Sequence, residues 1–208
     1  MAIFLLRTIT LHSNPPTLAG YVFRLRCAFL VLFVAMLTAG QPAWGQAAVP
    51  LREPDVPYEP SAMSVVKVML DMARVNARDV VFDLGCGDGR LVIAAVRERG
   101  ARGVCVDIDP QRITDARANA AKAGVAARIE FLNRDLFETD ISRADVVMLF
   151  LWPGVNMKLR PKLLKELKPG TRIVSHYHDM GDWKPERIEH VTVEGRRHPV
   201  YLWTVPRL

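Results

Sequence analysis

The sequence predicts an α/β domain of three layers, with helices on both faces of a mainly parallel sheet. Between residues 80 and 175, short and nearly continuous apolar runs alternate with segments of helical periodicity. Strands that are buried on both faces have this composition, so a parallel sheet is expected. Two β-rich runs, 187–194 and 199–205, close the chain, and the turn signal between them at residues 195–198 predicts an antiparallel C-terminal hairpin.

The first elements follow from proline content and apolar spacing. Residues 47–60 are rich in proline and predict an extended linker. Residues 61–75 place apolar side chains at helical spacing, which predicts an amphipathic helix. Residues 80–84 then form an apolar strand that runs into a glycine-rich turn at 85–89, and the helix after this turn is expected to end at Gly100.

The alternation of strand and helix then continues. A second strand is expected at 103–108, where Asp109 and Pro110 supply an N-cap and a first-turn proline for a helix that extends to Gly124. Further strands are expected at 128–132, 144–151 and 171–175. A short helix is expected at 161–168, closed by Pro169 and Gly170.

Composition and charge exclude one class of protein and argue against another. The chain has 208 residues, of which 50% are hydrophobic and 24% charged, and this excludes an intrinsically disordered chain. The formal net charge is +6, but residues 1–46 contain three arginines and no acidic residue. Half of the excess charge therefore belongs to this N-terminal segment. The remaining chain is nearly balanced, so its charge gives little reason to expect a nucleic-acid partner.

The N-terminal segment has the pattern of a secretory signal. Arg24 and Arg26 precede the apolar run 27–40, which is shorter than the ~20 residues needed to span a bilayer and is followed by small residues at 43–47. We therefore expect three parts: a signal peptide or membrane anchor at 1–46, a linker at 47–60 and the folded domain at 61–208. The expected protein is exported or membrane-anchored. The alternative is a cytoplasmic chain whose start codon is misassigned and whose apolar run is a buried helix.

Two cysteines lie in the folded part of the chain. Cys86 is in the glycine-rich turn and Cys105 is inside the second predicted strand. We expect small buried thiols, because the sequence contains no C-x-x-C pair and no disulfide framework. On this interpretation the cysteines neither support nor exclude export.

The glycine-rich turn reads Asp-Leu-Gly-Cys-Gly-Asp-Gly over residues 83–89. It lacks the lysine of a phosphate-binding loop, and the dinucleotide fingerprint would require glycine where Arg90 stands. Glycines at alternate positions let the backbone approach a ligand closely at the carboxyl end of a strand. Asp83, at the end of that strand, can accept a hydrogen bond from a cationic ligand group and neutralise it.

The same turn resembles motif I of the class I S-adenosylmethionine (SAM)-dependent methyltransferases. The resemblance implies a Rossmann-like SAM methyltransferase fold and SAM as the cofactor. It assigns the ribose hydroxyls to Asp107 and the exocyclic amino group of adenine to Asp135, with the backbone of Leu136 at the edge of the adenine ring. The complete set of expected cofactor-binding residues is Asp83, Gly85, Cys86, Gly87, Gly89, Asp107, Asp135 and Leu136.

A closer resemblance covers residues 56 to about 185. The segments VPYEPS (56–61), DLGCGDGR (83–90), FLWPGVNMKLRPKLLKELKPGTRIVSH (150–176) and MGDWKP (180–185) are similar to the lysine methyltransferases of the ATP synthase c-ring protein and of the adenine nucleotide carrier, and to their bacterial relatives. This resemblance implies methyl transfer to a lysine amine of a protein substrate. The alternatives are a small-molecule methyltransferase and a non-catalytic SAM-binding or nucleoside-binding module at a membrane.

The sequence identifies the residues that contact the methyl acceptor less clearly than those that bind the cofactor. Methylases of adenine, cytosine and glutamine carry an [ND]PP[YF] tetrad, but Leu-Trp-Pro-Gly stands in its place at 151–154, so no nucleic-acid partner is expected. The candidate residues near the acceptor come from the linker, the end of the fourth strand and the end of the fifth: Tyr58, Pro60, Phe150, Leu151, Trp152, Pro153 and His176. Alternatively, Trp152 and Pro153 only shape a turn, and Tyr58 is a linker residue that packs on the sheet. The resemblance favours a role for Tyr58 as a lid over SAM.

Two further patterns have both structural and functional interpretations. The run His-Tyr-His-Asp at 176–179 would suit a metal ion, but no companion ligands stand elsewhere, so a loop is favoured and no metal site is expected. The stretch 158–172 carries six basic residues and one acidic residue, which is typical of a solvated helix face. It would also suit contact with anionic lipid or an acidic partner. The sequence leaves the oligomeric state open.

Overall fold

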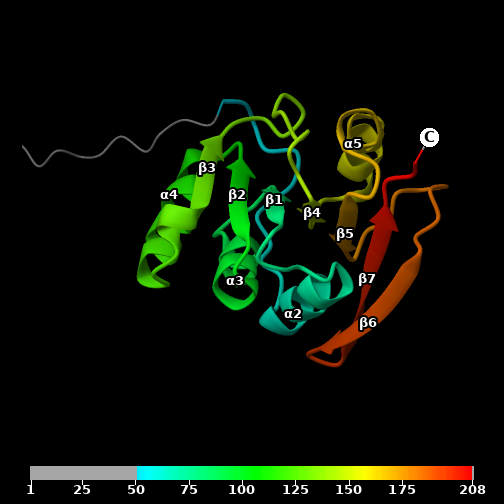
Figure 1. Cartoon of the computed structure of the whole chain (residues 1–208), viewed down its shortest axis with the longest axis horizontal. Helices are drawn as coiled ribbons and strands as arrows, with labels where there is room; N and C mark the ends of the chain where they lie inside the picture. Colours follow the sequence, from blue (N-terminus) through cyan, green and yellow to red (C-terminus); the bar gives the residue numbers. More distant parts are fainter. Residues whose placement is uncertain (1–50, 208) are drawn as a thin grey trace, which may run out of the picture. The chain divides into compact units, whose positions relative to one another are not determined.

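The computed structural model describes residues 51–207 and contains one seven-stranded sheet with the strand order β3-β2-β1-β4-β5-β7-β6 (Figure 1). The first five strands are parallel to one another, and β7 and β6 are antiparallel additions at one edge. The strands are β1 Val80–Leu84, β2 Arg102–Asp107, β3 Ile129–Asn133, β4 Val146–Leu149, β5 Arg172–His176, β6 Arg187–Val193 and β7 Arg196–Thr204. The α/β class and the mainly parallel sheet are confirmed.

Within residues 51–207, four α-helices and one short 3₁₀ helix accompany the sheet. They are α2 Met63–Met72, α3 Arg90–Arg99, α4 Pro110–Lys122, the 3₁₀ helix Ala126–Arg128 and α5 Pro153–Glu166. As expected, Asp109 caps α4: its side chain accepts a hydrogen bond from the amide of Gln111, and Pro110 occupies the first turn.

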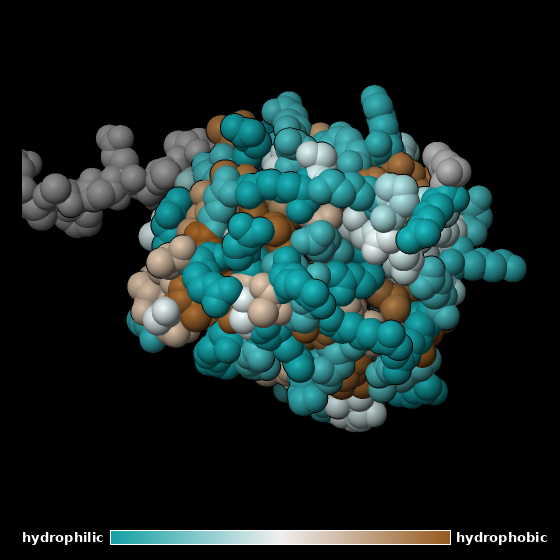
Figure 2. Space-filling model, viewed as in Figure 1, coloured by the Kyte–Doolittle hydropathy of each residue, from teal (hydrophilic) through white to brown (hydrophobic). Residues whose placement is uncertain are grey.

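Alternate residues of the central strands enter cores on opposite faces. In β1, Phe82 and Leu84 pack in the core that contains Val155, Leu159 and other residues of α5. Val81 packs in a second core with α2 and α3. Since strand side chains alternate between faces, both faces of β1 are covered and the sheet forms the middle of three layers. On the face drawn in Figure 2, hydrophilic side chains cover most of the surface and apolar residues form small patches between them.

Two predicted boundaries are wrong for local reasons. Helix α5 begins at Pro153 rather than at Pro161, because Pro153 takes the favoured first-turn position and Pro161 lies inside the helix. The C-terminal hairpin turns at Glu194 and Gly195, since Val193 pairs with Arg196. Both turn residues have positive φ, as a two-residue hairpin turn requires.

The expectation of free thiols is also wrong, because Cys86 and Cys105 form a disulfide. Residue Asp83 of β1 pairs with Cys105 of β2, so the turn that follows β1 brings Cys86 back over the neighbouring strand. Both residues are buried, as the sequence predicted. The disulfide covalently ties the glycine-rich turn to β2.

The order of the strands fixes where a ligand can bind. The chain leaves β1 toward β2 and β3 on one side, and β4 and β5 lie on the other side, so the topological switch point lies between β1 and β4. In Figure 1, the segment that leads from residue 51 to α2 crosses the carboxyl ends of the central strands. The expected N-terminal signal or anchor lies outside the described residues. Among residues 51–207, no helix combines the length and apolar character needed to cross a membrane.

Candidate cofactor and acceptor site

A cavity of about 300 Å³ opens at the carboxyl ends of β1 to β4. One wall is the segment 52–61, which we call the lid. The opposite wall consists of the glycine-rich turn and the ends of β2, β3 and β4. Nine of the predicted residues line this cavity: Tyr58, Pro60, Gly85, Cys86, Asp107, Asp135, Leu136, Phe150 and Leu151.

The glycines of the turn are required by close contacts with the cavity walls. A Cβ on Gly87 would lie 2.5 Å from Cε2 of Tyr58, and a Cβ on Gly85 would lie 2.9 Å from Cδ2 of Leu151. Both glycines also have positive φ, of +54° and +82°. Larger residues would therefore push Tyr58 and Leu151 away and strain the backbone.

Asp83 lies beneath the turn and has an unpaired carboxylate oxygen. Its side chain is buried, and Oδ2 has no hydrogen-bond partner among residues 51–207. Burial, with smaller contributions from the charges of Asp107 and Asp88, raises the pKa of Asp83 to about 8. A buried oxygen without a partner is costly, so this carboxylate is suited to a cationic ligand group.

Asp107 couples the end of β2 to the glycine-rich turn. Its Oδ2 accepts a hydrogen bond from the amide of Gly87 at 2.9 Å, and its Oδ1 accepts one from the amide of Asp109 at 3.0 Å. Burial raises the pKa of Asp107 above its usual value, although the two amide hydrogen bonds oppose this rise. A carboxylate held in this way keeps further lone pairs that can accept from hydroxyl groups.

Asp135, at the end of β3, is engaged by the lid. Its Oδ2 accepts a hydrogen bond from Nε of Arg52 at 2.7 Å, and its Oδ1 accepts one from the amide of Phe137 at 2.9 Å. Burial opposes the charge on Asp135, but these two hydrogen bonds outweigh it and lower the pKa of the carboxyl. Arg52 was not predicted as a site residue, because no local pattern in the sequence links it to a residue 83 positions later.

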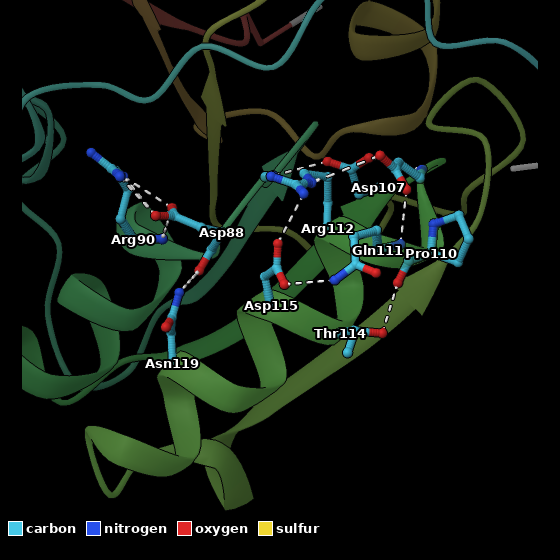
Figure 3. Close-up of polar contacts among 11 residues, drawn as sticks. Asp88, Arg90, Asp107, Pro110, Gln111, Arg112, Thr114, Asp115 and Asn119 are labelled. Carbon is cyan, nitrogen blue, oxygen red and sulfur yellow. Dashed lines mark hydrogen bonds and ion pairs between the residues drawn. The ribbon is translucent and has the colours of Figure 1, made fainter. Parts of the chain in front are cut away.

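Asp88 and Arg90 hold the turn against its neighbours, and Figure 3 shows both side chains. The guanidinium of Arg90 donates through Nε and Nη2 to the carboxylate of Asp88. Its Nη1 donates to the carbonyl oxygen of Ser61, at the end of the lid, at 2.8 Å. From α4, Asn119 donates to the carbonyl of Asp88 at 3.0 Å. These residues were missed as site residues, although Asp88 and Arg90 stand within the DLGCGDGR segment.

Tyr58 is the part of the lid that covers the turn. Its ring lies over Gly87, and the guanidinium of Arg112 in α4 lies 4.6 Å from the ring centroid. A cation in this position is attracted to the face of an aromatic ring. Helix α4 therefore helps to hold the lid in place above the cavity.

Three of the acceptor-side candidates, Trp152, Pro153 and His176, lie outside the cavity lining. Trp152 is the N-cap residue of α5 and is 51% exposed, and the exposed Pro153 follows it in the first turn. Their neighbours Phe150 and Leu151 line the cavity instead. Trp152 and Pro153 thus form part of the rim at the end of β4.

His176 is enclosed by hydrogen bonds. Its Nδ1 lies 2.9 Å from Oγ of Ser61, its Nε2 lies 3.0 Å from Nδ1 of His198, and its side chain is almost entirely buried. Burial, with a smaller contribution from His198, lowers the pKa of His176 to about 4, so the ring is neutral near pH 7. Both ring nitrogens are occupied, and His176 therefore connects the lid to β7. Within residues 51–207, no group of three or more His, Cys, Asp or Glu side chains is arranged to hold a metal ion.

The residues that line this cavity fit SAM. Asp83, which lies beneath the turn and not in the lining, offers an unpaired buried acceptor to a cationic amino group, and the glycines leave space that any Cβ would fill. Asp107 and Asp135 reach the same cavity from the ends of β2 and β3. Asp107 and Asp135 thus line one cavity, and the ligand contacts that the resemblance to class I methyltransferases implies for them stay a prediction.

Comparisons with known proteins agree with this geometry. The family model described as the ANTKMT methyltransferase domain matches residues 83–187. A protein-lysine N-methyltransferase of Saccharolobus islandicus (strain REY15A) is 45% identical over 153 residues, which are 73% of this chain and 95% of that protein. The adenine nucleotide translocase lysine N-methyltransferase of Mus musculus is 34% identical over 69% of this chain, and the match covers 62% of the mouse protein.

A solved structure is similar over a comparable share of the chain. It is described as an RNA methyltransferase from Salinibacter ruber in complex with S-adenosylhomocysteine. The sequence identity is 53%, the TM-score is 0.68, and the match covers 72% of this chain and 95% of that one.

Proposed function

We propose that this chain, which belongs to the family of the ANTKMT methyltransferase domain and is a SAM-dependent methyltransferase, transfers a methyl group to the side-chain amine of a protein lysine. The observation that carries this proposal is the 45% identity to a protein-lysine N-methyltransferase over 95% of that protein's length. The match covers nearly all of that protein and about three quarters of this chain.

The chain's own residues contribute binding, orientation and exclusion of water. SAM supplies an electrophilic methyl group on a sulfonium sulfur. Asp107 and Asp135, with Asp83 beneath the turn, would hold the ligand from one side, and the lid would cover it from the other. Phe150 and Leu151 form an apolar wall beside the acceptor. Alignment and desolvation of the two reactants account for much of the acceleration of such a displacement.

RNA is the second candidate acceptor, because the 53% identical neighbour is described as an RNA methyltransferase. The sequence gives less support to this alternative. The tetrad of amino-group base methylases is replaced by Leu-Trp-Pro-Gly, and an acidic residue, Glu59, lines the cavity. A carboxylate at this position favours a cationic acceptor over a polyanion.

The acceptor class can be tested by following labelled methyl groups. Purified protein is incubated with tritiated SAM and extracts of the source cells, and the products are treated with ribonuclease or with protease. We expect label that resists ribonuclease, is lost with protease and is recovered as methyl-lysine after hydrolysis. Label lost with ribonuclease would support RNA, and label of low mass would support a small-molecule acceptor. Asp107→Ala serves as the control with a damaged cofactor site.

We also propose contact with an anionic membrane through α5. Three of the six basic residues counted at 158–172 are paired: Arg160 with Asp182, Lys162 with Glu166 and Arg172 with Asp79. The other three, Lys158, Lys165 and Lys168, are exposed and have no ion-pair partner within residues 51–207. Each lysine near an anionic bilayer contributes about 1 kcal/mol.

Flotation with vesicles tests this contact. The triple variant with Lys158, Lys165 and Lys168 changed to Gln should bind phosphatidylserine vesicles several-fold more weakly than the wild type. Neutral phosphatidylcholine vesicles should not distinguish the two proteins. Equal binding of both proteins to the anionic vesicles would exclude a membrane role for these lysines.

Finally, we propose that the protein is exported or membrane-anchored through residues 1–46. The arginine-flanked apolar run supports this proposal, and so does the Cys86–Cys105 disulfide, since disulfides persist mainly in oxidising compartments. Fractionation of a C-terminally tagged chain, with sequencing of its N-terminus, tests the proposal. An intact N-terminus on a cytosolic species would instead support the cytoplasmic alternative.

A further inference from the structure

The turn that follows β5 holds a residue in a strained conformation. Tyr177 has a φ of +68°, and the amide of His178 donates a hydrogen bond to the carbonyl of His176 at 2.8 Å. An i to i+2 hydrogen bond around a residue of positive φ is the rare form of γ-turn, and it is unfavourable for a bulky residue. The sequence His-Tyr-His-Asp therefore adopts a backbone that its own preferences would not produce.

Several hydrogen bonds from other elements hold this turn. Oγ of Ser175 donates to the carbonyl of His178 at 2.6 Å, and the buried Asn156 of α5 donates to the carbonyls of His178 and Asp179, each at 3.2 Å. The amide of Tyr177 donates to the carbonyl of Pro199 in β7 at 2.8 Å. Strain that the surroundings hold in this way is concentrated at functional sites.

The turn places the ring of His178 beside Phe150, which lines the cavity, although His178 itself is not among the lining residues. The rings of His178 and Phe150 are inclined by 18°, with their centroids 6.4 Å apart, and Phe150 lines the cavity. His176 lies closer to Phe150, at 4.0 Å, but both of its nitrogens are occupied by Ser61 and His198. Neither ring nitrogen of His178 has a hydrogen-bond partner within residues 51–207. Of the two histidines beside Phe150, His178 is thus the one with a nitrogen available to a substrate.

We propose that His178 is the base that accepts the proton lost by the acceptor ammonium before methyl transfer. This inference rests on the proposed lysine acceptor. The N–H bonding pair stays on the amine nitrogen as its lone pair, and the proton moves to a ring nitrogen of His178, directly or through one water. The lone pair then forms the new N–C bond while the C–S bond of the methyl donor breaks and its electrons stay on sulfur. The histidinium afterwards releases its proton to solvent.

The charges around His178 suit this role. Burial lowers the pKa of His178 below its usual value, while the carboxylates of Glu59 and Asp179 oppose that shift. The neutral ring therefore predominates near pH 7. Tyr177 packs edge-on against His178 and also against His198, and the backbone of His178 is hydrogen-bonded to that of His176. A lysine ammonium has a pKa of ~10.4 in water, so the apolar wall formed by Phe150 and Leu151 must lower it before the transfer.

Glu59 completes the acceptor site from the lid. It lines the cavity, and its charge raises the pKa of His178, so it lies near both the cavity and the proposed base. An exposed carboxylate at this position attracts the incoming ammonium and stabilises the histidinium that forms. Glu59→Gln is therefore expected to raise KM for the acceptor more than it lowers kcat.

The pH dependence of kcat/KM for a lysine-containing acceptor tests His178. With the base present, kcat/KM should be level between about pH 7 and 9, because the enzyme binds the ammonium and removes its proton. His178→Asn should instead use only the acceptor that is already neutral. Its kcat/KM should be on the order of 10²-fold lower at pH 7 and should rise about tenfold per pH unit toward pH 10. His190→Asn, at an exposed position of β6, is the matched control and should keep the wild-type profile.

Three outcomes separate the hypotheses. A His178→Asn profile parallel to that of the wild type would overturn the role of His178 and leave the lysine acceptor intact. Failure of the wild type to label any lysine would overturn both proposals. If His178→Asn no longer binds S-adenosylhomocysteine, His178→Gly with added imidazole replaces it. Restored turnover that depends on the free-base imidazole concentration supports the role, and absence of rescue overturns it.

Discussion

Arg52 donates a hydrogen bond from Nε to Oδ2 of Asp135 at 2.7 Å and joins the start of the lid to the far end of β3. The same guanidinium also pairs with Asp55 within the lid, at 2.6 Å from Nη2 to Oδ2. Asp135 is the carboxylate assigned to the adenine amino group, and both of its oxygens already accept hydrogen bonds. A ligand that binds Oδ2 must share this oxygen with Arg52 or displace Arg52, so we expect this ion pair to act as a latch across the cavity.

Removal of the latch should change the kinetics of cofactor binding. In Arg52→Ala, we expect both the association and the dissociation rate constants of S-adenosylhomocysteine to rise several-fold, because the lid opens more easily. Stopped-flow fluorescence would measure both constants. Arg97→Ala removes a surface pair with Glu98 away from the cavity and should leave them unchanged. Wild-type rate constants in Arg52→Ala would show that the ion pair does not restrain the lid.

Gly87 should be intolerant of even one methyl group. In Gly87→Ala, the new Cβ would clash with the ring of Tyr58, so we expect the lid to be displaced and the affinity for S-adenosylhomocysteine to fall at least about tenfold. Gly124→Ala is the matched control, since Gly124 also has positive φ but nothing lies within 4 Å of the position that its Cβ would take. Calorimetric titration of both variants separates the clash from backbone strain. Equal losses of affinity would attribute the effect to strain alone.

Asp83 should make the ligand-free protein less stable as pH rises. The unfolded carboxyl ionises near pH ~3.9, whereas burial keeps the proton on the folded carboxyl up to about pH 8. Between these values the folded state binds more protons, so the free energy of unfolding falls as pH rises. Asp83→Asn should therefore match the wild type near pH 4 and be more stable by on the order of 2 kcal/mol at pH 8.5.

Urea unfolding at several pH values would measure this difference, with the exposed Asp140→Asn as a control that shows no such gain. Asp83→Asn should also lower the affinity of the protein for its cofactor. Because the amide has no negative charge for a cationic ligand group, S-adenosylhomocysteine should bind at least about tenfold more weakly. A stability difference that does not grow with pH would contradict the raised pKa of Asp83.

The Cys86–Cys105 disulfide should stabilise both the domain and its cofactor loop. It closes a loop with a sequence separation of 19, for which chain entropy predicts about 3 kcal/mol. Replacing both cysteines by serine should lower the free energy of unfolding by roughly that amount and weaken cofactor binding, since Cys86 lies in the turn that lines the cavity. Cys27→Ser is the control. Mass mapping that finds Cys86 and Cys105 in unlinked peptides of the native protein would contradict the pairing.

Local patterns in the sequence were sufficient to predict much of the cofactor side. The apolar run 80–84 and the glycines after it predicted β1 and its turn, and Asp109 with Pro110 predicted the start of α4. Such features depend on backbone preferences and burial over a few residues, which a sequence displays directly. The carboxylates Asp107 and Asp135 followed from the resemblance, and the fold brings both to one cavity.

The acceptor side depends on contacts between distant residues. The lid crosses to Asp135, His176 is enclosed by Ser61 and His198, and the strain at Tyr177 requires the carbonyl of Pro199. None of these partners can be identified from spacing, because each depends on which strands are neighbours and in which register they pair. The sequence by itself determined an α/β domain with a SAM-type glycine turn. Only the tertiary structure decided that Cys86 pairs with Cys105 and that His178, rather than His176, has a nitrogen available beside the cavity.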